Sequence, residues 1–340
     1  MLNGQSILIT GGTGSFGQGF VRTVLARYTP RRLIVFSRDE LKQSEMDAAL
    51  SHPALRFFIG DVRDAKRLCH AMRDVDYVVH AAALKQVPAA EYNPMECIKT
   101  NVYGAENVIH AAIENAVKKV IALSTDKAAN PINLYGTSKL ASDKLFIAGN
   151  NIAGGRPTRF AVVRYGNVVG SRGSVVPVFR DLLARGEHTL PITDRRMTRF
   201  WITLQQGIDF VLEAFQRVKG GEIFVPKIPS ARIVDIAAAM APDSPLQMVG
   251  KRPGEKLHEV MCPAEMSNQV IEFGDYYTIR PAIKFFDGKV DYYRDANGET
   301  GRPVADGFEY ESGTNPRFLS IPELERLLAP WISGGSSHSA

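Results

Sequence analysis

The sequence of 340 residues contains only three cysteines and two tryptophans, and it has no long apolar run. Cys69, Cys97 and Cys262 are odd in number and far apart, which argues against a disulfide framework. Neither they nor the seven histidines have the spacing of metal ligands. We therefore expect three buried free thiols and no metal site.

Segments that direct a chain to a membrane are also missing. No stretch approaches the roughly 18–20 apolar residues that a membrane helix needs. The N-terminal run MLNGQSILIT lacks the charged region and the long apolar region of a signal peptide. These absences predict a cytoplasmic protein with no membrane span.

Basic residues are not clustered either. The net charge of +5 is mild, and the sequence has no block of Lys and Arg of the kind found in nucleic-acid binders, so we expect no nucleic-acid partner. Hydrophobic residues make up 45% of the chain and charged residues 23%, which is ordinary for a globular protein with a buried core.

The first half of the chain alternates short apolar runs with helical patterns. Near-continuous apolar runs are typical of parallel strands that are covered on both faces. The expected strands are residues 6–10, 32–36, 55–59, 76–80, 119–124 and 159–165. The expected helices are residues 16–28, 39–50, 64–73, 95–116 and 134–149. This order predicts an α/β fold with a doubly wound parallel Rossmann sheet, and it assigns residues 1–166 to a dinucleotide-binding domain.

After residue 166 the pattern loosens. We expect residues 167–330 to form a smaller α/β substrate-binding cap that partly returns to the sheet. The expected elements here are helices at 176–186, 203–218, 232–240 and 321–329, strands at 222–225 and 246–249, and a polar, turn-rich segment at 288–316. Residues 331–340 are rich in Gly and Ser and are expected to be disordered.

A glycine-rich turn joins the first expected strand to the first expected helix. Gly11, Gly14 and Gly17 allow a tight turn, a close approach of the backbone to a pyrophosphate, and close packing of the helix on the strand. The helix N-terminus adds free N–H groups and a positive dipole end. We expect this loop to bind the cofactor phosphates together with the residues between the glycines, Thr13, Ser15 and Phe16.

The end of the second expected strand favours NADP. NAD sites carry an acid there for the ribose 2′-hydroxyl, whereas this chain has Ser37, Arg38 and Lys42, which can bind a 2′-phosphate. Asp39 would disfavour the phosphate only if it pointed inward. Other residues expected to line the cofactor path follow the third and fourth strands: Asp61, Val62, Ala81 and Ala82.

Tyr135 and Lys139 form a Tyr-x-x-x-Lys pair on one face of an expected helix. The lysine ammonium can lower the tyrosine pKa, so that the phenol becomes a usable base, and it can hold the cofactor ribose. Thr125 lies upstream at the end of the fifth strand, where it can hydrogen-bond a sugar hydroxyl, and Ser124 beside it is expected to reach the cofactor.

Asp126 and Lys127 follow as an adjacent acid and base. An alcohol dehydrogenase or a 4-epimerase needs neither group, but a dehydratase needs both. Oxidation at C4 of a sugar acidifies the C5 proton, a base removes it, and an acid protonates the departing C6 hydroxyl. Lys127 can be that base only if burial or a nearby cation such as Lys139 depresses its pKa. The residues alone leave open an exposed Asp-Lys turn.

These motifs resemble the extended short-chain dehydrogenase/reductase superfamily. Within it, the run STDKAANPINLYGTSK (124–139) is similar to inverting UDP-N-acetylglucosamine 4,6-dehydratases, which open the pseudaminic acid pathway. The resemblance continues at 80–94, 164–179, 193–203 and 252–259, and it is loose at 288–340. Retaining dehydratases carry Asp-Glu where this chain has Asp126-Lys127.

The resemblance implies roles for individual residues. It makes Lys127 the C5 base, Asp126 the acid for the C6 hydroxyl, and Tyr135 and Lys139 the pair for the redox step. Substrate contacts are implied for Lys85 (also near the cofactor), Asn167, Arg172, Arg199, Arg252 and Glu255. Arg199 and Arg252 would bind the diphosphate, and Glu255 the uridine ribose. The family further implies a UDP-sugar substrate and a homo-oligomer.

Three other functions remain open from the sequence. A retaining dehydratase fits Lys127 poorly, and a UDP-sugar 4-epimerase leaves the Asp-Lys pair unused. A non-catalytic NADP-sensing protein would have no need to keep both Tyr135 and Lys139.

Overall fold

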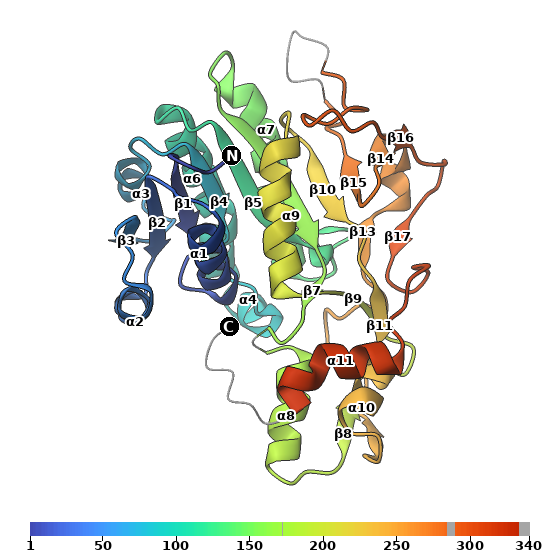
Figure 1. Cartoon of the computed structure of the whole chain (residues 1–340). Helices are drawn as coiled ribbons and strands as arrows, with labels where there is room; N and C mark the ends of the chain where they lie inside the picture. Colours follow the sequence, from blue (N-terminus) through green and yellow to red (C-terminus); the bar gives the residue numbers. More distant parts are fainter. Residues whose placement is uncertain (172, 284–289, 333–340) are drawn as a thin grey trace.

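The computed structural model describes residues 1–171, 173–283 and 290–332. A ten-stranded sheet runs through most of the chain, in the order β16-β14-β15-β10-β6-β5-β4-β1-β2-β3 (Figure 1). Its parallel strands are β1 (Ser6–Thr10), β2 (Arg32–Ser37), β3 (Leu55–Ile59), β4 (Tyr77–His80), β5 (Lys119–Thr125), β6 (Arg159–Tyr165) and β10 (Ile223–Pro226). The predicted doubly wound Rossmann sheet is confirmed.

The sheet continues past β10 with antiparallel strands that the sequence analysis did not predict. These strands are β14 (Val270–Glu272), β15 (Tyr276–Ile279) and β16 (Arg302–Pro303). They are short and lack a clear apolar alternation, which is why the pattern did not reveal them. More of the chain after residue 166 thus joins the main sheet than we expected.

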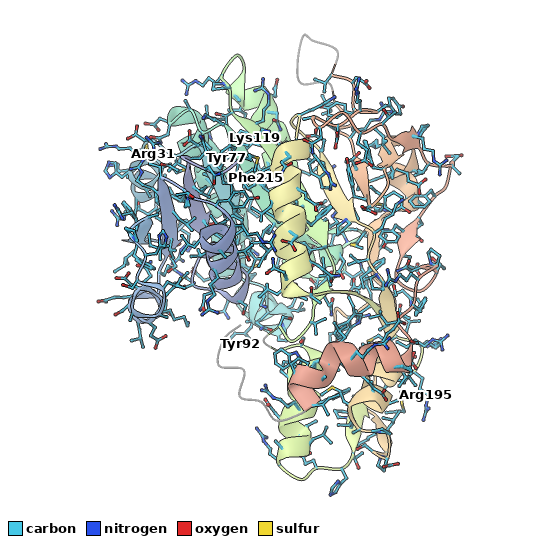
Figure 2. The ribbon with its side chains drawn as sticks, viewed as in Figure 1. Arg31, Tyr77, Tyr92, Lys119, Arg195 and Phe215 are labelled. Carbon is cyan, nitrogen blue, oxygen red and sulfur yellow. The ribbon has the colours of Figure 1, made fainter. Side chains whose placement is uncertain are left out.

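Helices cover both faces of the parallel strands (Figure 1). On one face α1 (Ser15–Arg27) packs against α9 (Leu204–Arg217), and on the other α6 (Gly104–Glu114) packs against α3 (Ala65–Ala71) and α7 (Leu134–Ala153). Contacts between side chains fix α9 on the sheet: Tyr77 meets Phe215 edge-on at 5.4 Å, and Lys119 Nζ donates to the Phe215 carbonyl (Figure 2).

The helix predicted over 95–116 is interrupted. The structure has α5 (Pro94–Ile98), a π-helical turn (Lys99–Tyr103) and then α6. The wider turn brings Asn101 inward, where its side chain bonds both the N–H and the carbonyl of Leu84 and the Ser138 hydroxyl. This turn therefore fixes the loop after β4 against α7.

Elements after β6 build a second, smaller apolar core beside the sheet. The core lies among α8 (Val175–Ala184), α10 (Ile233–Met240) and α11 (Ile321–Ile332), with β8 (Leu190–Ile192) and β9 (Thr198–Ile202). Remaining short elements are α2 (Glu40–Leu50), α4 (Val87–Tyr92), β7 (Asn167–Val168), β11 (Ser230–Arg232), β12 (Leu246–Met248), β13 (Val260–Cys262) and β17 (Tyr310–Glu311).

The cysteines and the C-terminal helix differ in part from what the sequence predicted. Cys97 and Cys262 are buried free thiols, whereas Cys69 is only half-buried. Across the described ranges, no helix has both the length and the apolarity that a membrane crossing requires. The last helix extends to Ile332, so its end overlaps the tail expected to be disordered; residues 333–340 lie outside the described residues.

Candidate active site

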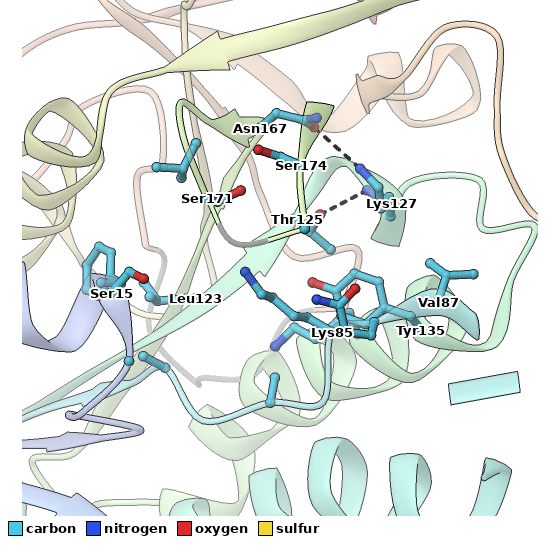
Figure 3. Close-up of a pocket in the computed structure, with 18 of the residues that line it drawn as sticks. Ser15, Lys85, Val87, Leu123, Thr125, Lys127, Tyr135, Asn167, Ser171 and Ser174 are labelled. Carbon is cyan, nitrogen blue, oxygen red and sulfur yellow. Dashed lines mark hydrogen bonds between the residues drawn. The ribbon is translucent and has the colours of Figure 1, made fainter. Parts of the chain in front are cut away.

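A cavity of about 860 Å³ opens at the carboxyl ends of the parallel strands. Its lining comes from the glycine loop, the ends of β2, β4 and β5, the start of α7, and the segments around 166–175 and 252–259. Figure 3 shows Lys85, Tyr135 and Lys127 around this space. Ligands of open α/β sheets bind at this edge, so the cavity is the candidate site.

Nearly all residues predicted for the site line this cavity. The exceptions are Asp126, which is fully buried behind the wall, and Arg172, which falls outside the described residues. The cavity joins residues that are far apart in sequence, because successive βαβ units bring all their strand ends to one edge.

The glycine loop leaves room for a dinucleotide phosphate. Gly11 has φ +65°, and a Cβ there would lie 2.8 Å from the Ala82 nitrogen. A Cβ on Gly17 would lie 2.4 Å from the Gly12 carbonyl oxygen. Gly14 caps α1 without a side-chain acceptor, so the first N–H groups of the helix remain available to an anion. These residues fit the pyrophosphate of a nicotinamide dinucleotide.

The end of β2 gathers charged side chains at the far side of the cavity. Arg38 reaches toward Asp61, with 3.6 Å between Nη1 and Oδ2. Asp39 is turned to the N-terminus of α2, where it accepts from the backbone N–H of Lys42 at 3.0 Å and pairs with the Lys42 ammonium. The Asp39 carboxylate is therefore already neutralised by partners on its own helix.

The Asp126–Lys127 pair lies in a 3-10 turn directly after β5. Lys127 Nζ is 3.0 Å from Asp126 Oδ1. It also lies 3.5 Å from Asn167 Oδ1, and Figure 3 shows this second contact. The Thr125 hydroxyl donates to the same Asp126 oxygen at 2.9 Å. Asp126 Oδ2 is buried and has no hydrogen-bond partner among the described residues. The alternative that Asp126 and Lys127 form an exposed turn is therefore wrong.

The condition set for Lys127 as a base, a depressed pKa, is not met in this structure. Burial alone lowers the pKa of the Lys127 ammonium, but the carboxylates of Asp126 and Glu259 more than offset burial, and the pKa lies well above its ordinary value. Lys127 is accordingly an ammonium in this site.

Tyr135 also departs from expectation. Burial raises the pKa of its phenol to about 12, although the Lys127 ammonium and a hydrogen bond with Thr125 act in the opposite direction. The main cation that favours the phenolate is thus Lys127, a residue for which the sequence suggested no such effect. Lys139 is itself buried, and burial lowers its pKa while Asp143 partly offsets that effect.

Three residues that support the site were not predicted from the sequence. Glu259 lies in the cavity wall beside Lys127. Buried Arg164 pairs with buried Asp143 at 3.1 Å, and Asp143 also accepts from the Ser124 hydroxyl at 2.8 Å. A run of mixed charges at 252–259 was the one available signal for Glu259, and it does not reveal which side chain points inward.

The expected diphosphate residues differ in their surroundings. Arg252 is exposed at the cavity, and Glu255 accepts from the Arg252 backbone N–H at 3.2 Å. Arg199 is buried, and its Nη groups donate to the carbonyls of three neighbouring residues, Thr198, Lys256 and Leu257. The Nη groups of Arg199 therefore already have acceptors within the protein, whereas the exposed guanidinium of Arg252 can reach a diphosphate in the cavity.

The fold and the site together define an enzyme of the extended short-chain dehydrogenase/reductase type. The criteria are a dinucleotide loop after β1, a Tyr-x-x-x-Lys pair on α7 and a polar strand end after β5, all facing one cavity. The chain belongs to the family described as polysaccharide biosynthesis protein, whose sequence model matches residues 7–281.

Three known proteins illustrate the similarity. A Campylobacter jejuni protein (serotype O:2) named UDP-N-acetylglucosamine 4,6-dehydratase (inverting) is 59% identical over 96% of this chain and 98% of its own length. A Rickettsia akari UDP-glucose 4-epimerase is 44% identical over 95% of both chains. The crystal structure of DesIV, a dTDP-glucose 4,6-dehydratase from Streptomyces venezuelae with NAD and TYD bound, matches with a TM-score of 0.67 and 25% identity, over 74% of this chain and 87% of that one.

Proposed function

We propose that this chain is an inverting UDP-N-acetylglucosamine 4,6-dehydratase that uses NADP. The product would be UDP-2-acetamido-2,6-dideoxy-β-L-arabino-hex-4-ulose. The observation that carries the proposal is the Asp126–Lys127 pair: Lys127 lines the cavity together with Tyr135, and Asp126, buried directly behind it, is hydrogen-bonded to Lys127 Nζ at 3.0 Å. The 59% identity to a protein with this name supports the same function.

The residues of the chain divide the chemistry among them. NADP, when bound, would take up the hydrogen from C4 and return it at C6. Tyr135 is the proposed acceptor of the proton from the C4 hydroxyl, and the Lys127 ammonium and the Thr125 hydroxyl favour the phenolate that this requires. Lys139 would hold the cofactor ribose from its place one turn along α7.

Elimination needs a proton to move within the Asp126–Lys127 pair. The raised pKa of Lys127 favours the ammonium, whereas the reacting pair needs a neutral amine and a protonated carboxyl group. Transfer along the 3.0 Å hydrogen bond from Nζ to Oδ1 produces that state. The amine then accepts the C5 proton, and Asp126 gives its proton to the C6 oxygen, which leaves as water. Once C6 has been reduced, the Lys127 ammonium would give a proton to C5 on the opposite face, which inverts that centre.

Preference for NADP follows from the end of β2. Arg38 and Ser37 line the cavity there, and the acid next to them, Asp39, is held by the N-terminus of α2 and by Lys42. We propose that Arg38 binds the 2′-phosphate with its guanidinium fork. The DesIV structure contains NAD, so the proposed preference for NADP rests on the residues at the end of β2 in this chain.

The substrate would lie between the two parts of the chain. We propose that residues 1–166 bind the dinucleotide and that residues 167–330 mainly bind UDP-N-acetylglucosamine or a related UDP-sugar, with Arg252 on the diphosphate and Glu255 on the uridine ribose. Lys85 and Asn167 would contact the sugar. A homo-oligomer stays a prediction.

A UDP-sugar 4-epimerase is the second candidate, and the 44% identity to a Rickettsia epimerase favours it. An epimerase would use Tyr135, Thr125 and Lys139 and would leave the Asp126–Lys127 pair without a chemical role. A retaining dehydratase is third, because that chemistry has a carboxylate in place of Lys127.

One experiment separates these candidates. Purified protein is incubated with UDP-N-acetylglucosamine in D2O, and the product is followed by proton NMR. Loss of water with deuterium at C5 and inverted C5 couplings is the expected result. Retention at C5 would favour the retaining dehydratase, a C4 epimer without loss of water the epimerase, and the absence of any reaction would contradict the proposed substrate.

Two variants test whether Lys127 is the base that removes the C5 proton. Lys127→Ala is expected to abolish deuterium exchange at C5, because it removes the base. Lys144→Ala is the matched control, since Lys144 lies on α7 at a position remote from the cavity lining. Exchange that persists in Lys127→Ala would contradict the role of Lys127.

A further inference from the structure

Glu259 is a buried carboxylate in the wall of the active site. It is 2% exposed and directly precedes β13, which packs against the 3-10 turn that carries Asp126 and Lys127. Its Oε1 lies 3.3 Å from Lys127 Nζ and 3.8 Å from Arg199 Nε. Lys127 thus lies between two buried carboxylates, Asp126 on its own turn and Glu259 on a distant segment.

The second oxygen of Glu259 is unusual. Oε2 has no hydrogen-bond partner within the described part of the chain, and the Lys256 ammonium lies 3.9 Å from it. Lys256 itself donates to the Ala129 carbonyl. A buried carboxylate with an unsatisfied oxygen is costly, so a site that retains one suggests a functional use for its charge.

The backbone holds Glu259 firmly in this position. Its N–H donates to the Ser312 hydroxyl at 2.9 Å, and its carbonyl accepts from the Ser312 N–H at 2.8 Å. Ser312 also bonds the Thr198 hydroxyl, next to Arg199 on β9. Glu259 therefore presents a fixed negative charge to a flexible lysine side chain.

We propose that Glu259 is a positioning residue that controls the proton on Lys127. This inference rests on the proposed dehydratase function, in which Lys127 exchanges a proton with C5. Glu259 holds the Lys127 ammonium within reach of Asp126, and its negative charge stabilises the ammonium that forms when the amine accepts the C5 proton. Asp126 is the partner that exchanges the proton, because Glu259 stays paired with Arg199.

The charges of the groups around Lys127 determine how loss of the Glu259 charge changes the pKa of this lysine. Asp126 and Glu259 favour the ammonium, Arg199 opposes it, and Asn167 contributes a neutral oxygen at 3.5 Å. Tyr135 on α7 and Lys256 also interact with Lys127, and Lys256 is a second cation near Glu259. Removal of the Glu259 charge leaves Asp126 as the one carboxylate on Lys127 among these groups.

The test measures the reactivity of Lys127 without relying on turnover. Full-length protein is acetylated with a trace of acetic anhydride across a pH series, and peptide mass spectrometry gives the labelling of Lys127 relative to Lys66, an exposed lysine on α3. In Glu259→Gln the midpoint of Lys127 labelling is expected to fall by roughly 1–3 pH units. Glu265→Gln, at a glutamate six positions further along the chain and outside the cavity lining, is the control and should leave the midpoint unchanged.

A second arm follows C5 deuterium incorporation from UDP-N-acetylglucosamine against pH. Exchange at C5 needs only a neutral Lys127 amine, whereas elimination also needs a proton on Asp126, so the rising limb of the exchange profile should move to lower pH in Glu259→Gln. If Glu259 had only a structural role, its loss would lower the rate of deuterium incorporation at every pH, and the pH of the rising limb would not change. That result, or an unchanged labelling midpoint, would overturn the proposal.

Two further outcomes are distinguishable. If Glu259→Gln does not fold, Lys256→Gln is used instead. It removes the cation that competes for Glu259, so labelling of Lys127 at fixed pH should slow several-fold, and unchanged labelling would overturn the proposal. If the unaltered protein forms no product but the Glu259→Gln labelling midpoint falls, the control of the Lys127 proton stands and the dehydratase function fails.

Discussion

Arg38 shows how a single side chain can set the choice of cofactor. It lines the cavity at the end of β2 and faces Asp61 at 3.6 Å. Arg38→Ala removes a charged hydrogen-bond donor, whose loss costs roughly 1.5–3 kcal/mol, or about a tenfold to hundredfold weaker affinity. We expect this loss for NADP and little change for NAD, measured by calorimetric titration of both.

Arg63 provides the control for this prediction. It pairs with the same Asp61, at 2.7 Å, but does not line the cavity. Arg63→Ala should leave the ratio of NADP to NAD affinity unchanged. Equal losses for both cofactors in Arg38→Ala would mean that Arg38 does not select the 2′-phosphate.

Residues of the site could be predicted from sequence where their signals are local. The glycine spacing and the Tyr135–Lys139 spacing depend on one loop and one helix, and both sets line the cavity. Charge states could not be predicted in the same way. The pKa of Lys127 depends on Glu259, a residue that only the tertiary fold brings within 3.3 Å.

At the scale of elements, the last helix supports a loop of the active site. Trp331 in the final turn of α11 lies against Gly170, where φ is +70° and a Cβ would be 1.8 Å from the indole Cζ2. Arg180 of α8 covers the indole at 5.5 Å from its ring centre. Gly170 and its neighbours Val169 and Ser171 line the cavity, so α11 fixes their position.

Trp331→Ala should therefore loosen the substrate side of the cavity without affecting the dinucleotide loop. We expect the KM for UDP-N-acetylglucosamine to rise several-fold while the Kd for NADP stays the same, in steady-state kinetics and cofactor titration. Ile332→Ala, at an exposed neighbour, is the control. A KM that does not change would show that the contact with Gly170 has no part in substrate binding.

Elements were predictable from sequence where their apolar patterns were long. The parallel strands, with near-continuous buried runs, lie within a residue or two of their predicted bounds. The π-helical turn at Lys99–Tyr103 was not predictable, because it interrupts a helix without Pro or Gly inside the turn. Its cause is tertiary: the buried Asn101 side chain connects the loop after β4 to α7.

Across the whole molecule, the two edges of the parallel sheet serve different purposes. The carboxyl ends of the strands form the cavity, and the opposite edge provides stability. Asp76, just before β4, illustrates the contribution to stability, because its carboxylate accepts from the Ser6 N–H at 2.8 Å and pairs with Lys118 at 3.0 Å. It thereby connects β1, β4 and β5 at a distance from the chemistry.

Because Asp76 lies away from the cavity, we expect its contribution to the free energy of unfolding to depend on pH and its loss to leave activity unchanged. Burial raises the pKa of Asp76, but the Ser6 N–H and the Lys118 and Arg31 cations outweigh burial and hold the pKa below its ordinary value. A depressed pKa stabilises the fold above the unfolded value of about 3.9, and the contribution is lost as the pH falls through the lower folded value. Asp76→Asn should reduce the free energy of unfolding by about 1–2 kcal/mol at pH 7.

The difference between Asp76→Asn and the unaltered protein should shrink as the pH falls below about 4, in urea unfolding followed by circular dichroism. Asp74→Asn is the control, because the Asp74 carboxylate is 81% exposed and should contribute little at any pH. A difference that stays constant with pH would assign the effect of Asp76 to packing instead of charge. Turnover of Asp76→Asn at pH 7 and low temperature should equal that of the unaltered protein, because Asp76 lies at the edge opposite the cavity and acts only on the stability of the sheet.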